Sequence, residues 1–237
     1  MTSWNRVGQR VGVLLLLQVA MGLTAPFIML HPLVSPPGFL ESAAGVANQT
    51  RAAVLLLFVG SALAIAIASA GWCVFSEYSS VMEIWLCALA VATFVLQAVD
   101  NAHILSMLSL SQAYAEAGAA KAEVFQALAL VVGSARKWSH YSFLLVVGCW
   151  IFLLFSLLYR FRLVPRVLAA FGMIGAVLQI AGVSLRGLLG YPPETRLAIP
   201  LAPAYVLMAV WLMVKGFDER QRPLRVDADG ASAGRTQ

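Results

Sequence analysis

Charged residues are scarce in this sequence. Of its 237 residues, 11% are charged and 61% are hydrophobic, whereas a soluble domain carries about 25% charged residues. This deficit argues against a soluble globular protein and favours a chain embedded in lipid. The net charge of +5 does not indicate nucleic-acid binding, because the Lys and Arg residues stand beside hydrophobic segments and form no basic face.

Cysteine and catalytic motifs are also sparse. Cys73, Cys87 and Cys149 are odd in number, far apart and inside apolar runs, so they predict no disulfide framework. The sequence has no Gly-x-Ser-x-Gly, no phosphate-binding loop, no Cys-x-x-Cys and no Ser-His-Asp order. These absences favour a non-enzymatic protein without excluding an enzyme.

Long hydrophobic stretches are what the sequence does have. A transmembrane helix needs roughly 20 apolar residues, because the hydrocarbon core is about 30 Å thick. In lipid each segment must satisfy its own backbone hydrogen bonds, so helix is the expected state. We predict an all-α, polytopic membrane protein whose six-span domain covers residues 1–217. The predicted spans are residues 11–30, 52–75, 84–110, 141–159, 167–185 and 197–214.

The flanking positive charges predict an orientation. With the N-terminus inside, ten Lys and Arg residues face the cytoplasm and five face the other side, while Arg186 lies at the edge of the fifth span. The cytoplasmic ten would be Arg6, Arg10, Arg160, Arg162, Arg166, Lys215, Arg220, Arg222, Arg225 and Arg235. This bias predicts a multi-pass protein of the inner (plasma) membrane with both termini in the cytoplasm.

Two segments fall outside the predicted spans. Residues 112–137 are Ala-rich, but their apolar part, residues 124–133, is too short to cross. We predict a separate helix there, lying on the outer face or partly re-entrant, because a crossing would reverse the charge bias. Residues 218–237 are polar and are predicted to be a disordered cytoplasmic tail.

Small residues and prolines mark the last two spans. Gly172, Gly175 and Ala176 form a ridge that is expected to allow close helix packing. Pro200 and Pro203 stand in the first turns of the sixth span, where they would bend the helix or cap its start.

The third predicted span carries a buried acid that requires a partner. A charge at the centre of a membrane helix costs about 2.5–3.5 kcal/mol, yet Asp100 lies in this span with Gln97 and Asn101 on its helix face. An ion pair between Asp100 and Arg186 is the simplest predicted element. The full set of candidate cavity residues is Gln97, Asp100, Asn101, His103, His140, Gln179 and Arg186.

Several interpretations of these residues remain open. In the first interpretation these residues have a structural role alone, in which Asp100 forms an ion pair with an arginine of a neighbouring helix. Asp100, His103 and His140 suit a zinc or non-haem iron site, since two imidazoles and a carboxylate bind either metal. A haem between His103 and His140 is a further hypothesis. A ligand cavity or conduction path lined by Gln97, Asp100, Gln179 and Arg186 is the hypothesis that we favour.

The C-terminal third resembles a known family. The segment Leu163-Val-Pro165-Arg166-Val-Leu-Ala-Ala-Phe-Gly172-Met-Ile-Gly175-Ala176 and the later Val210-Trp211-Leu-Met-Val-Lys215-Gly216-Phe217 are similar to those of a bacterial membrane family, domain of unknown function 4386. Val167 stands where that family commonly has Trp. The resemblance implies a six-helix inner-membrane protein and attaches no activity or cofactor to it.

These observations predict a small binding or transport module, or a membrane sensor or subunit, with a polar cavity towards the outer leaflet. The expected partners are the lipid bilayer and a small ligand or ion. The alternative function is a metal- or haem-binding redox protein, or an intramembrane enzyme, built on Asp100, His103 and His140. No motif identifies a substrate or a protein partner.

Overall fold

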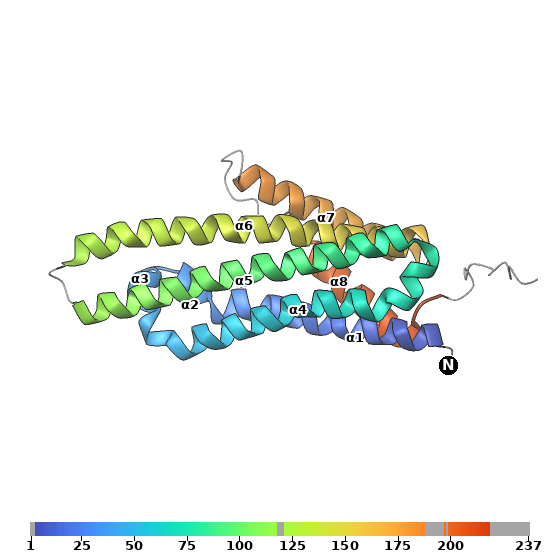
Figure 1. Cartoon of the computed structure of the whole chain (residues 1–237), viewed down its shortest axis with the longest axis horizontal. Coiled ribbons are helices and arrows are strands. Elements are labelled where there is room, and N and C mark those ends of the chain that lie inside the picture. Colours follow the sequence, from blue (N-terminus) through green and yellow to red (C-terminus); the bar gives the residue numbers. More distant parts are fainter. Residues whose placement is uncertain (1–2, 118–120, 188–196, 198, 219–237) are drawn as a thin grey trace, which may run out of the picture.

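The computed structural model describes residues 3–117, 121–187, 197 and 199–218, and these ranges are helical without any strand (Figure 1). The predicted all-α class is therefore confirmed. The short element η1 is a π-helical turn and η2 a 3-10 turn. The elements in chain order are α1 (Ser3–Thr24), η1 (Ala25–Met29), α2 (His31–Val34), α3 (Phe39–Ser42), η2 (Ala44–Val46), α4 (Ala47–Tyr78), α5 (Ser80–Ala117), α6 (Ala122–Arg160), α7 (Arg166–Gly187) and α8 (Leu201–Lys215).

The long helices follow one another around a ring. α1 packs against α4, α4 against α5, α5 against α6, α6 against α7, α7 against α8, and α8 against α1. The antiparallel helices α5 and α6 extend beyond the rest at the end where the chain passes from one to the other (Figure 1). We call this end of the bundle the hairpin end, and the opposite end, where α1 begins and α8 stops, the terminal end.

Within the described residues, five helices are long and apolar enough to cross a membrane, which is the pattern of a multi-pass membrane protein. The candidate spans are Trp4–Met29, Ala44–Tyr78, Ser80–Ala117, Ala122–Arg160 and Arg166–Gly187. The sixth predicted span is shorter than expected, because α8 has only 15 residues and starts after Pro200, its N-cap residue. A helix of that length covers roughly 22 Å, so the count of six full spans is not confirmed.

The separate helix predicted over residues 112–137 is not present. Residues up to Ala117 continue α5, and residues from Ala122 onward belong to α6. With 38 and 39 residues, each helix is about 57–58 Å long, nearly twice the roughly 30 Å of hydrocarbon. The stretch is Ala-rich and lacks proline, so α5 continues into it as far as Ala117 and α6 begins within it at Ala122. Its apolar residues extend two spans and do not form a span of their own.

The short elements after α1 pack against the hairpin end of α5. The Ser111 hydroxyl donates to the carbonyl of Leu40 at 2.9 Å and accepts from the Ala44 amide at 2.9 Å. Leu33, Ala43, Ile104 and Leu108 join an apolar cluster with their neighbours on α4. The segment between α1 and α4 therefore covers one side of the extension.

The main hydrophobic core occupies the terminal half of the bundle. Its largest fully buried side chains include those of Phe75, Trp150, Phe155 and Phe217. Phe155 packs directly against Gly172, where a Cβ atom would collide with the aromatic ring. The ridge predicted around Gly172 therefore serves close packing of α6 against α7.

A second close approach joins the first and last helices. A Cβ atom on Gly12 would lie 2.7 Å from the backbone nitrogen of Met213 and 2.8 Å from the carbonyl oxygen of Ala209. Helix α1 and helix α8 therefore touch backbone to backbone, which holds α8 in the ring. The predicted tail, apart from Asp218, lies outside the described residues.

Candidate functional site

A column of polar side chains runs along the buried face of α5. Thr93, Gln97 and Asp100 are each no more than 2% exposed. Their spacing of four and three residues places them on one helix face, over about 10 Å of helix rise. Asn101 points towards α4, where its side-chain nitrogen donates to the carbonyl of Val54 at 3.3 Å. Its side-chain oxygen accepts a hydrogen bond from Gln97 Nε2 at 2.9 Å.

The carboxylate of Asp100 is bound by one turn of α6. Nδ1 of His140 lies 3.2 Å from Oδ2, and the Ser139 hydroxyl donates to Oδ1 at 3.2 Å. The guanidinium Nε of Arg136 lies 3.8 Å from Oδ1. An ionised carboxylate only accepts hydrogen bonds, so this contact assigns the proton of the imidazole to Nδ1. Asp100 therefore has the partners that a buried carboxylate requires.

The predicted ion pair between Asp100 and Arg186 is not formed. Arg186 lies instead over the ring of Tyr141, with its guanidinium carbon 5.9 Å from the ring centroid. The order of the helices explains the difference: α5 packs against α6, and α7 packs against α6 and α8. The nearest arginine to Asp100 is therefore the one that α6 supplies, Arg136.

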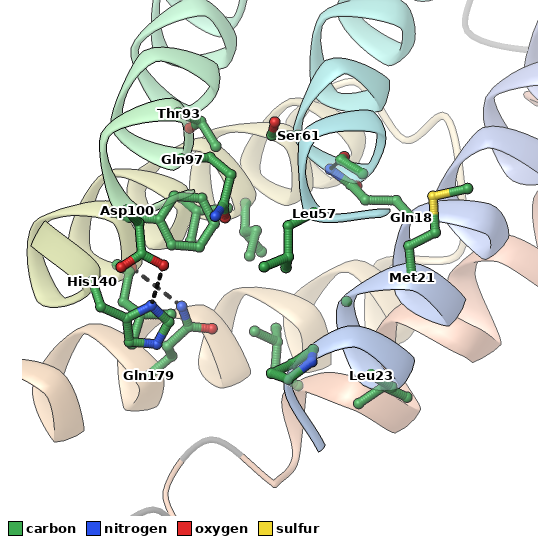
Figure 2. A pocket seen from close by; sticks show the side chains of 18 of the residues that line it. Gln18, Met21, Leu23, Leu57, Ser61, Thr93, Gln97, Asp100, His140 and Gln179 are labelled. Atoms are coloured by element: carbon green, nitrogen blue, oxygen red, sulfur yellow. Dashed lines mark hydrogen bonds and ion pairs between the residues drawn. The ribbon is translucent and has the colours of Figure 1, made fainter. Parts of the chain in front are cut away.

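Gln179 contacts α6 as well. Its side-chain nitrogen donates to the carbonyl of Leu144 at 3.2 Å, and the residue is 8% exposed. His140, Gln179 and Asp100 thus converge from three helices, as Figure 2 shows. The sequence placed these residues at similar depth, and the fold brings them together.

His103 does not join this group. Its Nδ1 lies 2.8 Å from the carbonyl oxygen of Val99 on its own helix. Among the described residues, no three His, Cys, Asp or Glu side chains gather in a way that could hold a metal ion. Asp100, His103 and His140 are therefore not brought together as a set of three metal ligands, and the haem between His103 and His140 stays a prediction.

A cavity of about 780 Å³ opens beside the polar column. All six helices of the ring contribute to its wall, and most of the lining side chains are apolar. Five of the predicted cavity residues line it, whereas Asn101 and His103 do not; the five are Gln97, Asp100, His140, Gln179 and Arg186. Figure 2 shows Gln97, Asp100, His140 and Gln179 on one side of the space and Gln18 of α1 on the opposite wall.

Sequence reasoning missed the α1 wall. Gln18 and Gly22 line the cavity, and a Cβ atom built on Gly22 meets no atom within 4 Å. Gln18 stands alone as a polar residue within an apolar run, which is a signal that could have found it. Thr93, seven residues before Asp100, could have been found by its helical spacing.

Several buried polar atoms of the cavity wall make no hydrogen bond. In the described part of the chain these are Oε1 of Gln18, Oγ1 of Thr93 and Nε of Arg136. A buried polar atom without a partner costs about 1–3 kcal/mol. The wall therefore offers an acceptor, a hydroxyl and a charged donor to a molecule inside the cavity.

A family model matches residues 11–216, which is most of the chain and includes every cavity residue named above. It is the model of a domain of unknown function, DUF4386. The chain belongs to this family. No curated protein and no solved structure matches the sequence.

The two segments that carry the resemblance to DUF4386 meet at the terminal end. The backbone amide of Asp218 donates to the carbonyl of Leu163 at 2.9 Å. The side chain of Phe217, the residue before Asp218, is buried. Gly216 has a φ of 69° and lies against Asn5, a conformation that favours glycine. These family segments therefore close the terminal end of the ring, on the side away from the charged residues of the cavity.

Proposed function

We propose that this DUF4386 protein binds a small ligand in the cavity beside α5, as a binding or transport module or as a ligand-responsive membrane sensor or subunit. The observation that carries the proposal is the combination of a 780 Å³ cavity with Asp100, Arg136 and His140 in its wall. Ligand sites are typically concave, mostly apolar and about 300–1,000 Å³ in volume, with a few convergent polar groups.

A purely structural role accounts for less of this geometry. If Asp100 served only to join α5 to α6, its carboxylate and the α6 turn would suffice. The unpartnered atoms of Gln18 and Thr93 lie on the same cavity wall without contributing to that junction. Ionisable and polar groups inside a membrane commonly mark ligand or ion routes, which supports a binding function.

We further propose that the chain lies in the inner (plasma) membrane with both termini in the cytoplasm. The flanking charges support this orientation, because ten of the sixteen Lys and Arg residues would then be cytoplasmic. In this orientation the hairpin end faces outward. The charged end of the cavity then lies towards the outer leaflet.

The test blocks the cavity with a side chain that causes no clash. Gly22→Leu places a branched side chain where a Cβ atom meets nothing, and Gly133→Leu is the matched control on α6, outside the cavity. Purified full-length protein is incubated with a chloroform–methanol extract of cell membranes or with the aqueous cell extract. Native mass spectrometry then measures bound small molecules.

We expect a stoichiometric adduct from one extract on the wild type and on Gly133→Leu, and its loss on Gly22→Leu. Gly60→Leu provides a second blocking variant, because its Cβ atom would meet only Met21 at an ordinary 3.5 Å. Thermal unfolding curves confirm that each variant is folded. An absence of adducts with both extracts, or an adduct that both blocking variants retain, would contradict the proposed function.

A further inference from the structure

The described charges that line the cavity do not cancel. Asp100 supplies one negative charge, and Arg136 and Arg186 supply two positive charges, with His140 as a further potential cation. Arg136 is the guanidinium beside Asp100. Within the described residues, Arg186 makes no ion pair, and its guanidinium carbon lies 5.9 Å from the centroid of the Tyr141 ring. The residue is exposed near the C-terminal end of α7, and a guanidinium without a carboxylate partner favours a carboxylate or phosphate ligand.

Most of the remaining wall is apolar. Leu57, Val147, Ile151 and Tyr205 line the space from three different helices, α4, α6 and α8. An inorganic anion would leave this surface without contacts, whereas a hydrocarbon chain would cover it. The cavity volume of about 780 Å³ lies within the range of drug-sized ligands. It suits one hydrocarbon chain with a compact headgroup.

The rim of the cavity continues into the outer surface of the bundle. Leu23, Phe27 and Ile199 line the cavity, yet their side chains are 42%, 71% and 64% exposed. On a membrane-spanning bundle, exposed apolar side chains face lipid. A molecule from the bilayer therefore meets a continuous apolar path past these residues.

We propose that the cavity takes up a single-chain anionic amphiphile from the bilayer, past Leu23, Phe27 and Ile199, and holds its carboxylate or phosphate headgroup against Arg186 and Arg136. This inference rests on the proposed binding function and specifies the ligand class. The chain lies along the apolar wall. Gln97, which is one turn from Asp100 on α5 and lines the same space, gives a further hydrogen bond to the headgroup.

Arg186 has a matched control on its own helix. Arg166 stands at the other end of α7, outside the cavity, with its guanidinium carbon 5.5 Å from the ring centroid of Tyr159. Arg186 has the same relation to Tyr141 at 5.9 Å. Arg186→Gln and Arg166→Gln therefore remove the same charge and the same kind of ring contact, one at the cavity and one away from it.

The experiment uses full-length protein in nanodiscs of zwitterionic phosphatidylcholine. Oleate and oleyl phosphate are the anionic amphiphiles, oleyl alcohol is their neutral counterpart, and acetate and inorganic phosphate are the same headgroups without a chain. Binding is measured by native mass spectrometry of protein released from the nanodiscs, for the wild type, Arg186→Gln, Arg186→Lys, Arg166→Gln and Gly22→Leu. Thermal unfolding confirms that each variant is folded.

We expect an anionic amphiphile to bind at least about tenfold more tightly than oleyl alcohol, and Arg186→Gln to weaken it by about tenfold, which is the loss of one charge-assisted hydrogen bond. Arg186→Lys should lose less, Arg166→Gln should match the wild type, and Gly22→Leu should abolish binding. Chainless anions should not bind measurably.

Three results would overturn the inference while leaving ligand binding intact. Equal binding of oleyl alcohol would mean an apolar site without charge recognition. Equal binding of acetate or phosphate would mean a free-anion site. A ligand from the aqueous extract, with no binding of either amphiphile, would mean a different ligand class. Unchanged amphiphile affinity in Arg186→Gln would also contradict the placement of the headgroup.

Discussion

His140 Nδ1 lies 3.2 Å from Asp100 Oδ2, which ties α5 to α6 inside the bundle near the polar end of the cavity. The Ser139 hydroxyl and Arg136 reach the other carboxylate oxygen from the same turn of α6. One acid of α5 is thus bound by three side chains from a single turn of one neighbouring helix. This arrangement both satisfies Asp100 and leaves Arg186 available to the cavity.

The first prediction concerns the coupling between Asp100 and Arg136. We expect Asp100→Asn and Arg136→Gln each to destabilise the bundle, by at most about 3 kcal/mol, because each leaves a charge without its partner. Arg136 keeps 17% exposure, which limits the cost. The double variant should recover part of the loss, with a coupling of about 0.5–3 kcal/mol.

Unfolding by SDS in mixed micelles measures these free energies. The double variant Asp100→Asn with Arg166→Gln is the matched control. Arg166 begins α7 at the terminal end of the bundle and contacts Tyr159, not Asp100. We expect that pair to be additive. Strict additivity of Asp100→Asn and Arg136→Gln would show that the two side chains do not interact.

The second prediction concerns the contact between α1 and α8. In Gly12→Ala the added methyl group would lie 2.7 Å from the Met213 backbone nitrogen, and a backbone atom cannot move aside without displacing α8. We expect a loss of at least about 1–3 kcal/mol, the usual cost of overpacking. Gly133→Ala is the control, because its Cβ atom would meet only Phe39 at 3.8 Å.

Thermal unfolding in detergent compares the two alanine variants. A glycine-to-alanine change in an open helical site is neutral or stabilising, since alanine is the better helix former by about 1 kcal/mol. Gly133→Ala should therefore melt at or above the wild-type temperature and Gly12→Ala well below it. Equal melting temperatures would show that α1 and α8 tolerate a wider separation.

The third prediction concerns the orientation in the membrane. Glu123→Cys and Arg166→Cys place single thiols on exposed residues at the hairpin end and the terminal end respectively. The native cysteines are replaced first, with Cys87→Ser chosen to keep a donor to Glu83, and Cys73→Ala and Cys149→Ala at the two exposed positions. A membrane-impermeant maleimide should label residue 123 in intact cells and residue 166 only after permeabilisation.

Labelling after permeabilisation confirms that both thiols are reactive, so a negative result in intact cells is informative. The reverse pattern would place both termini outside. It would also place the charged end of the cavity towards the inner leaflet, which changes the leaflet from which the proposed amphiphile enters without altering the site itself.

Hydropathy was a better guide to which segments are helical than to how long each helix is. Each predicted span overlaps a helix of the described residues, although the sixth overlaps only the short α8, which begins at Leu201. An apolar run has no other way to satisfy its backbone in lipid. The lengths of α5 and α6 could not be predicted from hydropathy. Residues 112–137 are too polar in part to mark a span, yet helix propensity extends α5 to Ala117 and begins α6 at Ala122.

The sequence by itself determined that the chain is an all-helical membrane-type protein with a polar face on α5, because composition and helical spacing are local properties. Only the tertiary structure decided that Asp100 contacts His140 and Arg136 and that Arg186 remains for the cavity. Helix neighbours are set by packing between segments far apart in the chain. The sequence therefore favoured Arg186 as the partner of Asp100, whereas the order of helices around the ring places Arg136 beside it.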